Sequence, residues 1–144
     1  MDEVVEAGYE WIELGPYGYL PTNPETLRAE LSQRGLKVSG TFTLANLEDP
    51  SLWPEVERQV LGGGELLASV GGKFMVLIDD VTTDWFTGER IAPEFLDEDD
   101  WNRLIDTTHK VADIVREEFD LTLAFHSSPD THVAYEDQLE TLLE

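Results

Sequence analysis

"KFMVLIDD", residues 73 to 80, places five consecutive apolar side chains directly before two aspartates. A short run of this kind is typical of a strand in a parallel sheet, where helices or other layers cover both faces. The two aspartates mark the point at which the strand leaves the sheet. This stretch therefore predicts a parallel sheet with polar groups where its strands end.

Three further strands are predicted around it, and helical patterns lie between them. The expected strands are residues 9–14, 37–44, 73–80 and 121–126, and the expected helices cover residues 2–7, 23–35, 101–115 and 135–144. Residues 52–60 and 65–70 are interpreted as two helical pieces broken by Gly62, Gly63 and Gly64. The long segment 81–98 is interpreted as a functional loop or lid. Strands that alternate with helices favour parallel pairing through crossover connections, so the sequence predicts an α/β protein.

The composition limits the classes of partner. With 31 acidic and 9 basic residues the net charge is -22, which repels both a phosphate backbone and anionic lipid, so neither nucleic acid nor a membrane is expected as a partner. The chain has no cysteine, which excludes disulfides and thiolate metal sites. The first residues lack a basic, apolar leader, so the expected location is the cytoplasm.

Alternation within the strands separates two rows of side chains. Leu121, Leu123 and Phe125 oppose Thr122, Ala124 and His126, and Ile12 and Leu14 oppose Trp11 and Glu13. In the second strand, Val38, Phe42 and Leu44 oppose Ser39, Thr41 and Thr43. We expect the apolar rows to pack on helices and the polar rows to face the inside of a barrel. An open doubly wound sheet would also place ligands at strand ends, so the residues alone leave both folds open.

Several segments together resemble a known family. "EAGYEWIELGPYGYLP", "LKVSGTFTLAN", "GGKFMVLIDD" and "LAFHSSPDTHVAYEDQLETLL" are similar to the sugar phosphate isomerase/epimerase family of xylose-isomerase-like TIM barrels, near the inosose dehydratases. Members of that family are about twice this long. The resemblance implies a single partial (β/α)8 TIM-barrel domain over residues 1–144, with about four parallel strands and intervening helices. It would lack the first strand and the last βα units.

The resemblance also implies a divalent metal, Mn²⁺, Co²⁺ or Mg²⁺, in the full-length protein. Enzymes of this kind typically hold it with two glutamates, an aspartate and a histidine. His126 matches the first histidine of the family's fourth-strand motif, and Asp130, Thr131 and His132 are in register with it. Ser128 stands where a histidine is usual, and Ala134 stands where a glutamate is common. The metal ligands of this chain are therefore left unassigned.

Chemistry at a sugar carbonyl needs a base and a group that stabilises the developing oxyanion. Glu13 and His126 are the predicted catalytic residues. Asp79, Asp80, Asp130 and His132 are predicted to bind substrate, and each of these side chains also has an ordinary structural alternative as a cap, turn or solvated group.

Three functional hypotheses follow from the resemblance. The first is a fragment of a sugar or polyol isomerase, epimerase or dehydratase that uses metal-assisted proton transfer. The second is a non-catalytic descendant that binds sugars or partners, which Ser128 and Ala134 favour. The third, an endonuclease of the same superfamily, conflicts with the charge of -22. Because half a barrel leaves open strand edges and bare apolar surface, we also expect the chain to dimerise or aggregate.

Overall fold

The structure, a computed structural model, describes residues 1–143. Its elements, in chain order, are α1 (Asp2–Glu6), β1 (Trp11–Pro16), α2 (Pro24–Arg34), β2 (Lys37–Ala45), the 3₁₀ helix η1 (Pro50–Leu52), α3 (Trp53–Ser69), β3 (Phe74–Asp79), α4 (Glu98–Phe119), β4 (Thr122–Phe125) and α5 (Glu136–Leu143). The four predicted strands are all present, and helices separate them as expected.

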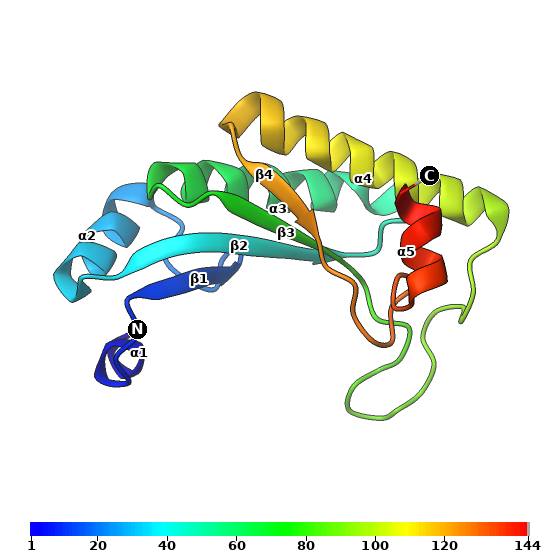
Figure 1. Cartoon of the computed structure of the whole chain (residues 1–144), viewed down its shortest axis with the longest axis horizontal. Helices are drawn as coiled ribbons and strands as arrows, with labels where there is room; N and C mark the ends of the chain where they lie inside the picture. The colour runs from blue at the N-terminus through cyan, green and yellow to red at the C-terminus, as the bar shows by residue number, and fades with distance from the viewer. Residues whose placement is uncertain (144) are drawn as a thin grey trace.

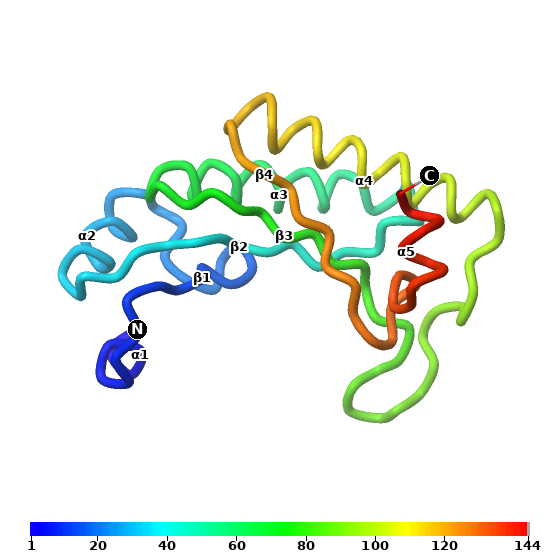
Figure 2. The backbone as a smooth tube through the Cα atoms, in the orientation of Figure 1, coloured from blue at the N-terminus to red at the C-terminus, as the bar shows by residue number. Residues whose placement is uncertain are grey.

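The strands form one sheet in the order β1-β2-β3-β4, and each neighbouring pair is parallel. Helices α3 and α4 lie together along one face of the sheet, and α5 lies beyond the carboxyl ends of the strands (Figure 1). The backbone tube follows the same order, and the chain after β4 passes beside the loop that follows β3 (Figure 2). Sequential parallel strands covered by helices on one face are the arrangement of a partial (β/α)8 barrel, as predicted.

Local signals in the sequence explain where the helices begin and end. The side chain of Asn23 accepts a hydrogen bond from the Thr26 amide at the start of α2, and Gly35 ends that helix in the left-handed conformation. Asp97 accepts a hydrogen bond from the Asp100 amide and so caps α4. These residues set where α2 and α4 begin and where α2 ends.

The core lies between the sheet and its helices. Its fully buried members include Leu27, Val60, Leu67, Met75, Leu77, Leu104, Val111, Val115 and Val133. Leu104, Val111 and Val115 lie on the predicted face of residues 101–115, and Val133 follows β4. Among residues 1–143, no helix is both long and apolar enough to cross a bilayer.

The predicted break at Gly62, Gly63 and Gly64 is wrong, because α3 continues through all three. Two of these glycines make room for aromatic rings instead. A Cβ atom on Gly62 would lie 2.6 Å from the Tyr17 ring, and one on Gly64 would overlap the Phe119 ring. The low helix propensity of glycine is therefore outweighed here by close packing of α3 on its neighbours.

The predicted faces of β2 are also wrong over most of its length. Ile12 pairs with Val38 but Glu13 pairs with Gly40, so Ser39 is an extra residue in β2 and the alternation shifts there. As a result Thr41 and Thr43 are buried toward the helices, not on the barrel interior. Thr41 stays satisfied in this position because its hydroxyl donates to the Gly15 carbonyl at 2.7 Å.

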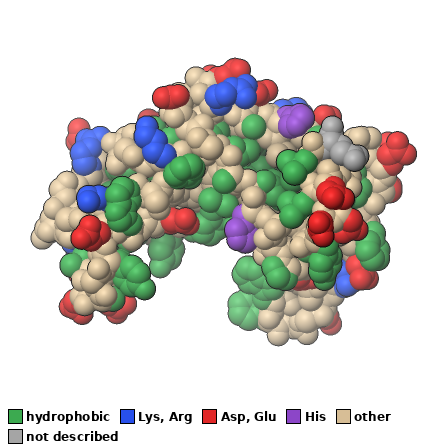
Figure 3. Space-filling model, in the orientation of Figure 1, with side chains coloured by type: hydrophobic (Ala, Val, Ile, Leu, Met, Phe, Trp, Pro, Cys, Tyr) green, Lys and Arg blue, Asp and Glu red, His purple; other side chains and the backbone are tan. Residues whose placement is uncertain are grey.

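The opposite face of the sheet, here called the inner face, carries an apolar centre. Register places Phe42, Leu44, Phe74, Val76 and Ile78 on it. The side chain of Phe74 is 51% exposed, and the other four are half-buried. Figure 3 shows the molecule hollowed on this side, with hydrophobic side chains gathered in the hollow. The strand at residues 73–80 is therefore covered by the described residues on its helix side only.

Candidate functional site

Both predicted catalytic residues lie on the inner face. Glu13 belongs to a row that runs through Gly40 and Phe74 to Thr122, and its side chain is exposed. His126 follows β4, donates its backbone amide to the Leu77 carbonyl at 2.9 Å, and is exposed as well. The predicted inward rows of β1 and β4 are thus confirmed.

The sheet separates these two side chains widely. Glu13 is on β1 and His126 follows β4, which are the two edges of the sheet. Three strand spacings amount to about 14 Å, and His126 lies four residues beyond Thr122 in the row of Glu13, or about 13 Å further along the strand. The described residues therefore do not bring Glu13 and His126 together, and their catalytic roles stay predictions.

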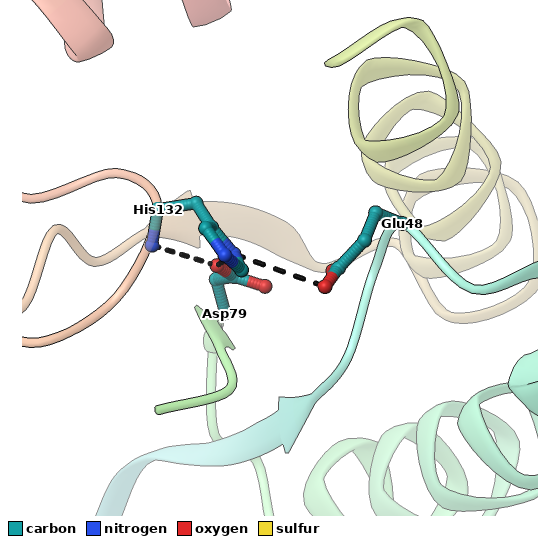
Figure 4. Close-up of side chains that lie close together, drawn as sticks. All are labelled: Glu48, Asp79 and His132. Carbon is teal, nitrogen blue, oxygen red and sulfur yellow. Dashed lines mark hydrogen bonds and ion pairs between the residues drawn. The ribbon is translucent and has the colours of Figure 1, made fainter. Parts of the chain in front are cut away.

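A second group of ionisable side chains lies on the helix side of the strand ends. Glu48 follows β2, Asp79 is the last residue of β3, and His132 lies in the loop between β4 and α5 (Figure 4). All three are buried, and one ligand atom from each lies within 4.8 Å of the others. The carboxyl ends of three adjacent parallel strands thus supply two carboxylates and an imidazole to one place.

Hydrogen bonds fix the ring of His132. Its backbone amide donates to Asp79 Oδ2 at 3.0 Å, and its Nδ1 lies 2.9 Å from the same oxygen. Its Nε2 lies 2.9 Å from the Pro93 carbonyl oxygen, which accepts only, so Nε2 carries a hydrogen. Glu48 Oε1 lies 3.8 Å from Nδ1 and accepts a hydrogen bond from Asn46 Nδ2 at 2.6 Å.

The surroundings change the acidity of two members of this group. Burial raises the pKa of the Glu48 carboxyl, and the negative charge of Asp79 adds to that rise. Burial by itself would lower the pKa of His132. The hydrogen bonds to Asp79 and Pro93 and the charges of both carboxylates outweigh it, so the pKa of His132 is raised. The group therefore favours bound positive charge.

Asp130 joins the loop after β4 to the loop after β3. Its Oδ1 accepts from the hydroxyls of Thr82 at 2.6 Å and Thr83 at 2.8 Å, and its carbonyl accepts from the Thr82 amide at 2.7 Å. These hydroxyls lower the pKa of the Asp130 carboxyl. The segment interpreted as a lid is thus tied down at its start by Asp130 and near its end by the bond from His132 to Pro93.

The remaining predicted site residues have local contacts. Asp80 is half-buried, and its side chain accepts from the Val81 amide at 2.8 Å. Ala134 precedes α5, where its amide donates to Gln138 Oε1 at 2.8 Å. Substrate binding by Asp79, Asp80, Asp130 and His132 stays a prediction, since the contacts described for these side chains are within the chain.

Two cavities adjoin the buried group. One of about 230 Å³ is lined by Glu94, Phe95, Leu96, Trp101, His132, Asp137, Gln138 and Thr141. Another of about 370 Å³ is lined by Asn46, Glu48, Asp49, Pro50, Pro93, Leu96, Asp100 and Arg103. His132 therefore borders the first cavity and Glu48 the second. Leu96 borders both, and it lies in the part of the predicted loop that precedes α4, residues 81–97, here called the 81–97 segment.

Sequence reasoning missed Glu48, although a usable signal was present. Residues 45–50, "ANLEDP", form the polar stretch at which β2 ends. This stretch lies at the same end of the sheet as the ends of β3 and β4, near which Asp79 and His132 were selected. The same rule, that ligands gather at the carboxyl ends of parallel strands, applies to it. Pro93 could not have been found, because a backbone carbonyl leaves no trace in residue type.

The ligands needed by the metal that the resemblance implies can be compared with the side chains present. Among residues 1–143, the group of Glu48, Asp79 and His132 is the set of three or more ligand-type side chains that lie close enough to share an ion. Its nitrogen and oxygen donors suit a divalent cation. It faces the helix side of the sheet, however, because Asp79 continues the buried row of Met75 and Leu77. The inner face of the described residues therefore lacks such a set.

Comparison with known proteins yields one curated relative and several solved structures. The chain is 27% identical to an inosose dehydratase of Geobacillus kaustophilus strain HTA426, over the whole chain and 47% of that protein. No protein-family model matches the sequence. The chain thus spans about half the length of this relative.

The structural neighbours have the same architecture. A xylose isomerase-like TIM barrel protein from Mycobacterium smegmatis in complex with magnesium matches with a TM-score of 0.76 at 16% identity, over 98% of this chain and 49% of that one. The IOLI protein with a zinc atom matches with a TM-score of 0.70 at 18% identity, over 98% and 50%. D-psicose 3-epimerase from Clostridium cellulolyticum H10 with D-tagatose gives 0.66 at 16% identity, over 98% and 52%.

The fold is accordingly that of part of a TIM barrel, represented by four parallel strands. In sequence the chain is similar to an inosose dehydratase, and its structural neighbours include a D-psicose 3-epimerase and a sugar phosphate isomerase/epimerase. The resemblance stated from the sequence is confirmed.

Proposed function

We propose that this chain forms one half of a sugar or polyol isomerase, epimerase or dehydratase that moves a proton on a carbon next to a carbonyl. The observation that carries the proposal is the likeness to inosose dehydratase over the entire chain. The neighbouring D-psicose 3-epimerase, solved with D-tagatose, supports a small polyhydroxylated substrate. On this proposal residues 1–144 are one partial barrel domain, and further βα units complete the site.

The inner face supplies the chain's own part of the chemistry. An exposed carboxylate, Glu13, is able to accept a proton from carbon or a hydrogen bond from a sugar hydroxyl. His126, at the carboxyl end of β4, is able to donate to a carbonyl or hydroxyl oxygen. Because they lie on strands at opposite edges of this sheet, we propose that each faces a different part of the substrate.

A divalent metal would supply positive charge near the carbonyl oxygen that becomes negative in the reaction. The magnesium and zinc in neighbouring structures support such a metal, with Mn²⁺, Co²⁺ and Mg²⁺ as candidates. The inner face described here lacks a set of ligands for it. We therefore assign the inner-face metal ligands to the units that complete the barrel. Location in the cytoplasm and the absence of nucleic-acid partners stay predictions of the composition.

The experiment follows solvent deuterium into the substrate by proton NMR. The full-length protein is incubated in D₂O with inosose and with a panel of ketohexoses, with added Mn²⁺ or with EDTA. Because a general acid or base contributes about 10²- to 10⁴-fold, we expect Glu13→Gln to slow exchange at least about 100-fold. His126→Asn is expected to slow it as well.

Glu10→Gln is the matched control, since Glu10 precedes β1 and its nearest cation is Lys37 at 3.7 Å. Its exchange rate should equal that of the unaltered protein. Sugar binding detected by saturation transfer without any deuterium exchange would replace the catalytic proposal with the non-catalytic one. Equal rates for Glu13→Gln and Glu10→Gln would remove Glu13 from the mechanism.

A further inference from the structure

The buried group formed by Glu48, Asp79 and His132, here called the strand-end triad, contains a contact that needs a positive species. Pro93 requires a hydrogen on Nε2 of His132, so a neutral ring would present the lone pair of Nδ1 to Asp79 Oδ2. These two atoms are only 2.9 Å apart. Two lone pairs at this separation repel each other unless a proton or a cation lies with them.

A proton on Nδ1 would satisfy only part of the triad. It would bond Nδ1 to Asp79 Oδ2, but Glu48 Oε2 and Asp79 Oδ1 are buried and have no hydrogen-bond partner among the described residues. The relative exposure of these two side chains is 10% and 1%. The neighbouring Arg103 does not fill the gap, because its Nε donates to the Glu48 backbone carbonyl at 3.0 Å and its Nη2 pairs with Asp100. Unpaired buried carboxylate oxygens are costly.

A divalent cation would balance the negative charge of the two carboxylates and would also coordinate their unpaired oxygens. Two carboxylates and one imidazole are suited to Zn²⁺ and similar ions. The Nε2 hydrogen bond to a backbone carbonyl is the outer contact that metal-bound histidines usually make, and it leaves Nδ1 as the ligand. The cavity of about 370 Å³ beside Glu48 leaves room for a water ligand.

From this geometry we propose that Glu48, Asp79 and His132 bind one divalent cation that holds together the loops after β2, β3 and β4. Through the His132–Pro93 bond the ion also fixes the end of the 81–97 segment. This site faces the helix side of the sheet and is separate from the inner face, so it does not depend on the proposed function.

The test uses the chain after chelator treatment, titrated with Zn²⁺ by calorimetry and with Co²⁺ by visible absorption. Salt of about 0.15 M or more keeps the Debye length at about 8 Å or less and so limits loose binding by the surface acids. We expect one ion per chain. Because loss of an outer-shell partner alone costs about 10- to 100-fold in affinity, Glu48→Gln should weaken binding at least about tenfold.

Glu65→Gln is the matched control, since Glu65 is an exposed acid on α3 outside the triad. The affinity of this variant for Zn²⁺ should equal that of the parent chain. Circular dichroism confirms that each variant is folded, and Asp79→Asn repeats the test at a second ligand. Thermal unfolding should shift upward with Zn²⁺ in the parent chain and in Glu65→Gln, and much less in Glu48→Gln. No uptake, or equal affinity in both glutamate variants, would overturn the proposal and leave a protonated His132 as the occupant. Because these readouts need no sugar and no turnover, their failure would leave the proposed function standing.

Discussion

Gly64 lowers the helix propensity of α3 but allows this helix to pack closely against the ring of Phe119. Glycine in a helix interior costs about 0.5–1 kcal/mol relative to alanine, yet α3 contains three in succession. A Cβ on Gly63 would sit 3.5 Å from the Met75 Cε, an ordinary contact, whereas a Cβ on Gly64 would overlap the Phe119 ring. Gly63 and Gly64 therefore differ in whether an added Cβ atom would clash, and alanine substitutions can test this difference.

We predict that Gly63→Ala raises the free energy of unfolding by about 0.5–1 kcal/mol, because it gains helix propensity without a clash. Gly64→Ala should lower it by about 1–2 kcal/mol, because overpacking costs about 1–3 kcal/mol and exceeds that gain. Urea unfolding monitored by circular dichroism measures both. A stabilised Gly64→Ala variant would mean that Phe119 moves aside freely and that α3 and α4 are loosely packed.

At the scale of the element, the 81–97 segment depends on the carboxylate of Asp130. Asp130 has a φ of 64°, and Asp120 at the end of α4 has a φ of 53°, so glycine fits both positions without strain. Of these two aspartates, Asp130 but not Asp120 bonds to the segment, through Thr82 and Thr83. Replacing each aspartate by glycine therefore compares the loss of this bond with the same change at a left-handed position that lacks it.

We predict that Asp130→Gly speeds amide hydrogen exchange at Thr82, Ile91 and Ala92, whose amides bond to Asp130 or Thr82. Losing two hydrogen bonds to a charged group lowers the free energy of local opening. Asp120→Gly should leave exchange at these amides unchanged. If the two variants give the same rates, the segment is held by other contacts and Asp130 is not its anchor.

The elements also show which features the sequence determines locally. Alternation of strands and helices, the cap at Asn23 and the end at Gly35 follow from neighbours in sequence, and all were predictable. The continuity of α3 and the shift at Ser39 depend on partners distant in sequence, the Phe119 ring and the pairing of β1 with β2. Residue type and spacing indicate only the local contribution to helix continuity and strand register.

The same distinction applies to the candidate sites. Asp79 and His132 were selected because they follow strands, which is a local signal, but their contact with each other and with Glu48 depends on the register of three strands. Likewise, the inward orientation of Glu13 and His126 was predictable from alternation. Their separation was not, because it depends on strand order across the sheet.

At the scale of the whole molecule, we expect the inner face to determine whether the chain self-associates in solution. Phe42, Leu44, Phe74, Val76 and Ile78 lie on it, and β1 and β4 each have a strand neighbour on one side only within the described chain. Backbone groups on an unpaired strand edge pair readily with another chain, and a contiguous apolar patch favours association. Repulsion from a charge of -22 acts against this, but it is long-range and falls with added salt.

We therefore predict that the 144-residue chain by itself forms dimers or larger assemblies, and that association strengthens as salt screens the repulsion. Phe74→Glu, at the start of β3 on the inner face, should shift the population toward monomer, because it places a charge in the apolar contact. Leu61→Glu is the control, since Leu61 is 40% exposed on α3 and away from the inner face. Light scattering coupled to size exclusion measures the mass of each. A monodisperse parent monomer at high salt would show that the inner face is tolerated in water, and association equal in both variants would place the contact elsewhere.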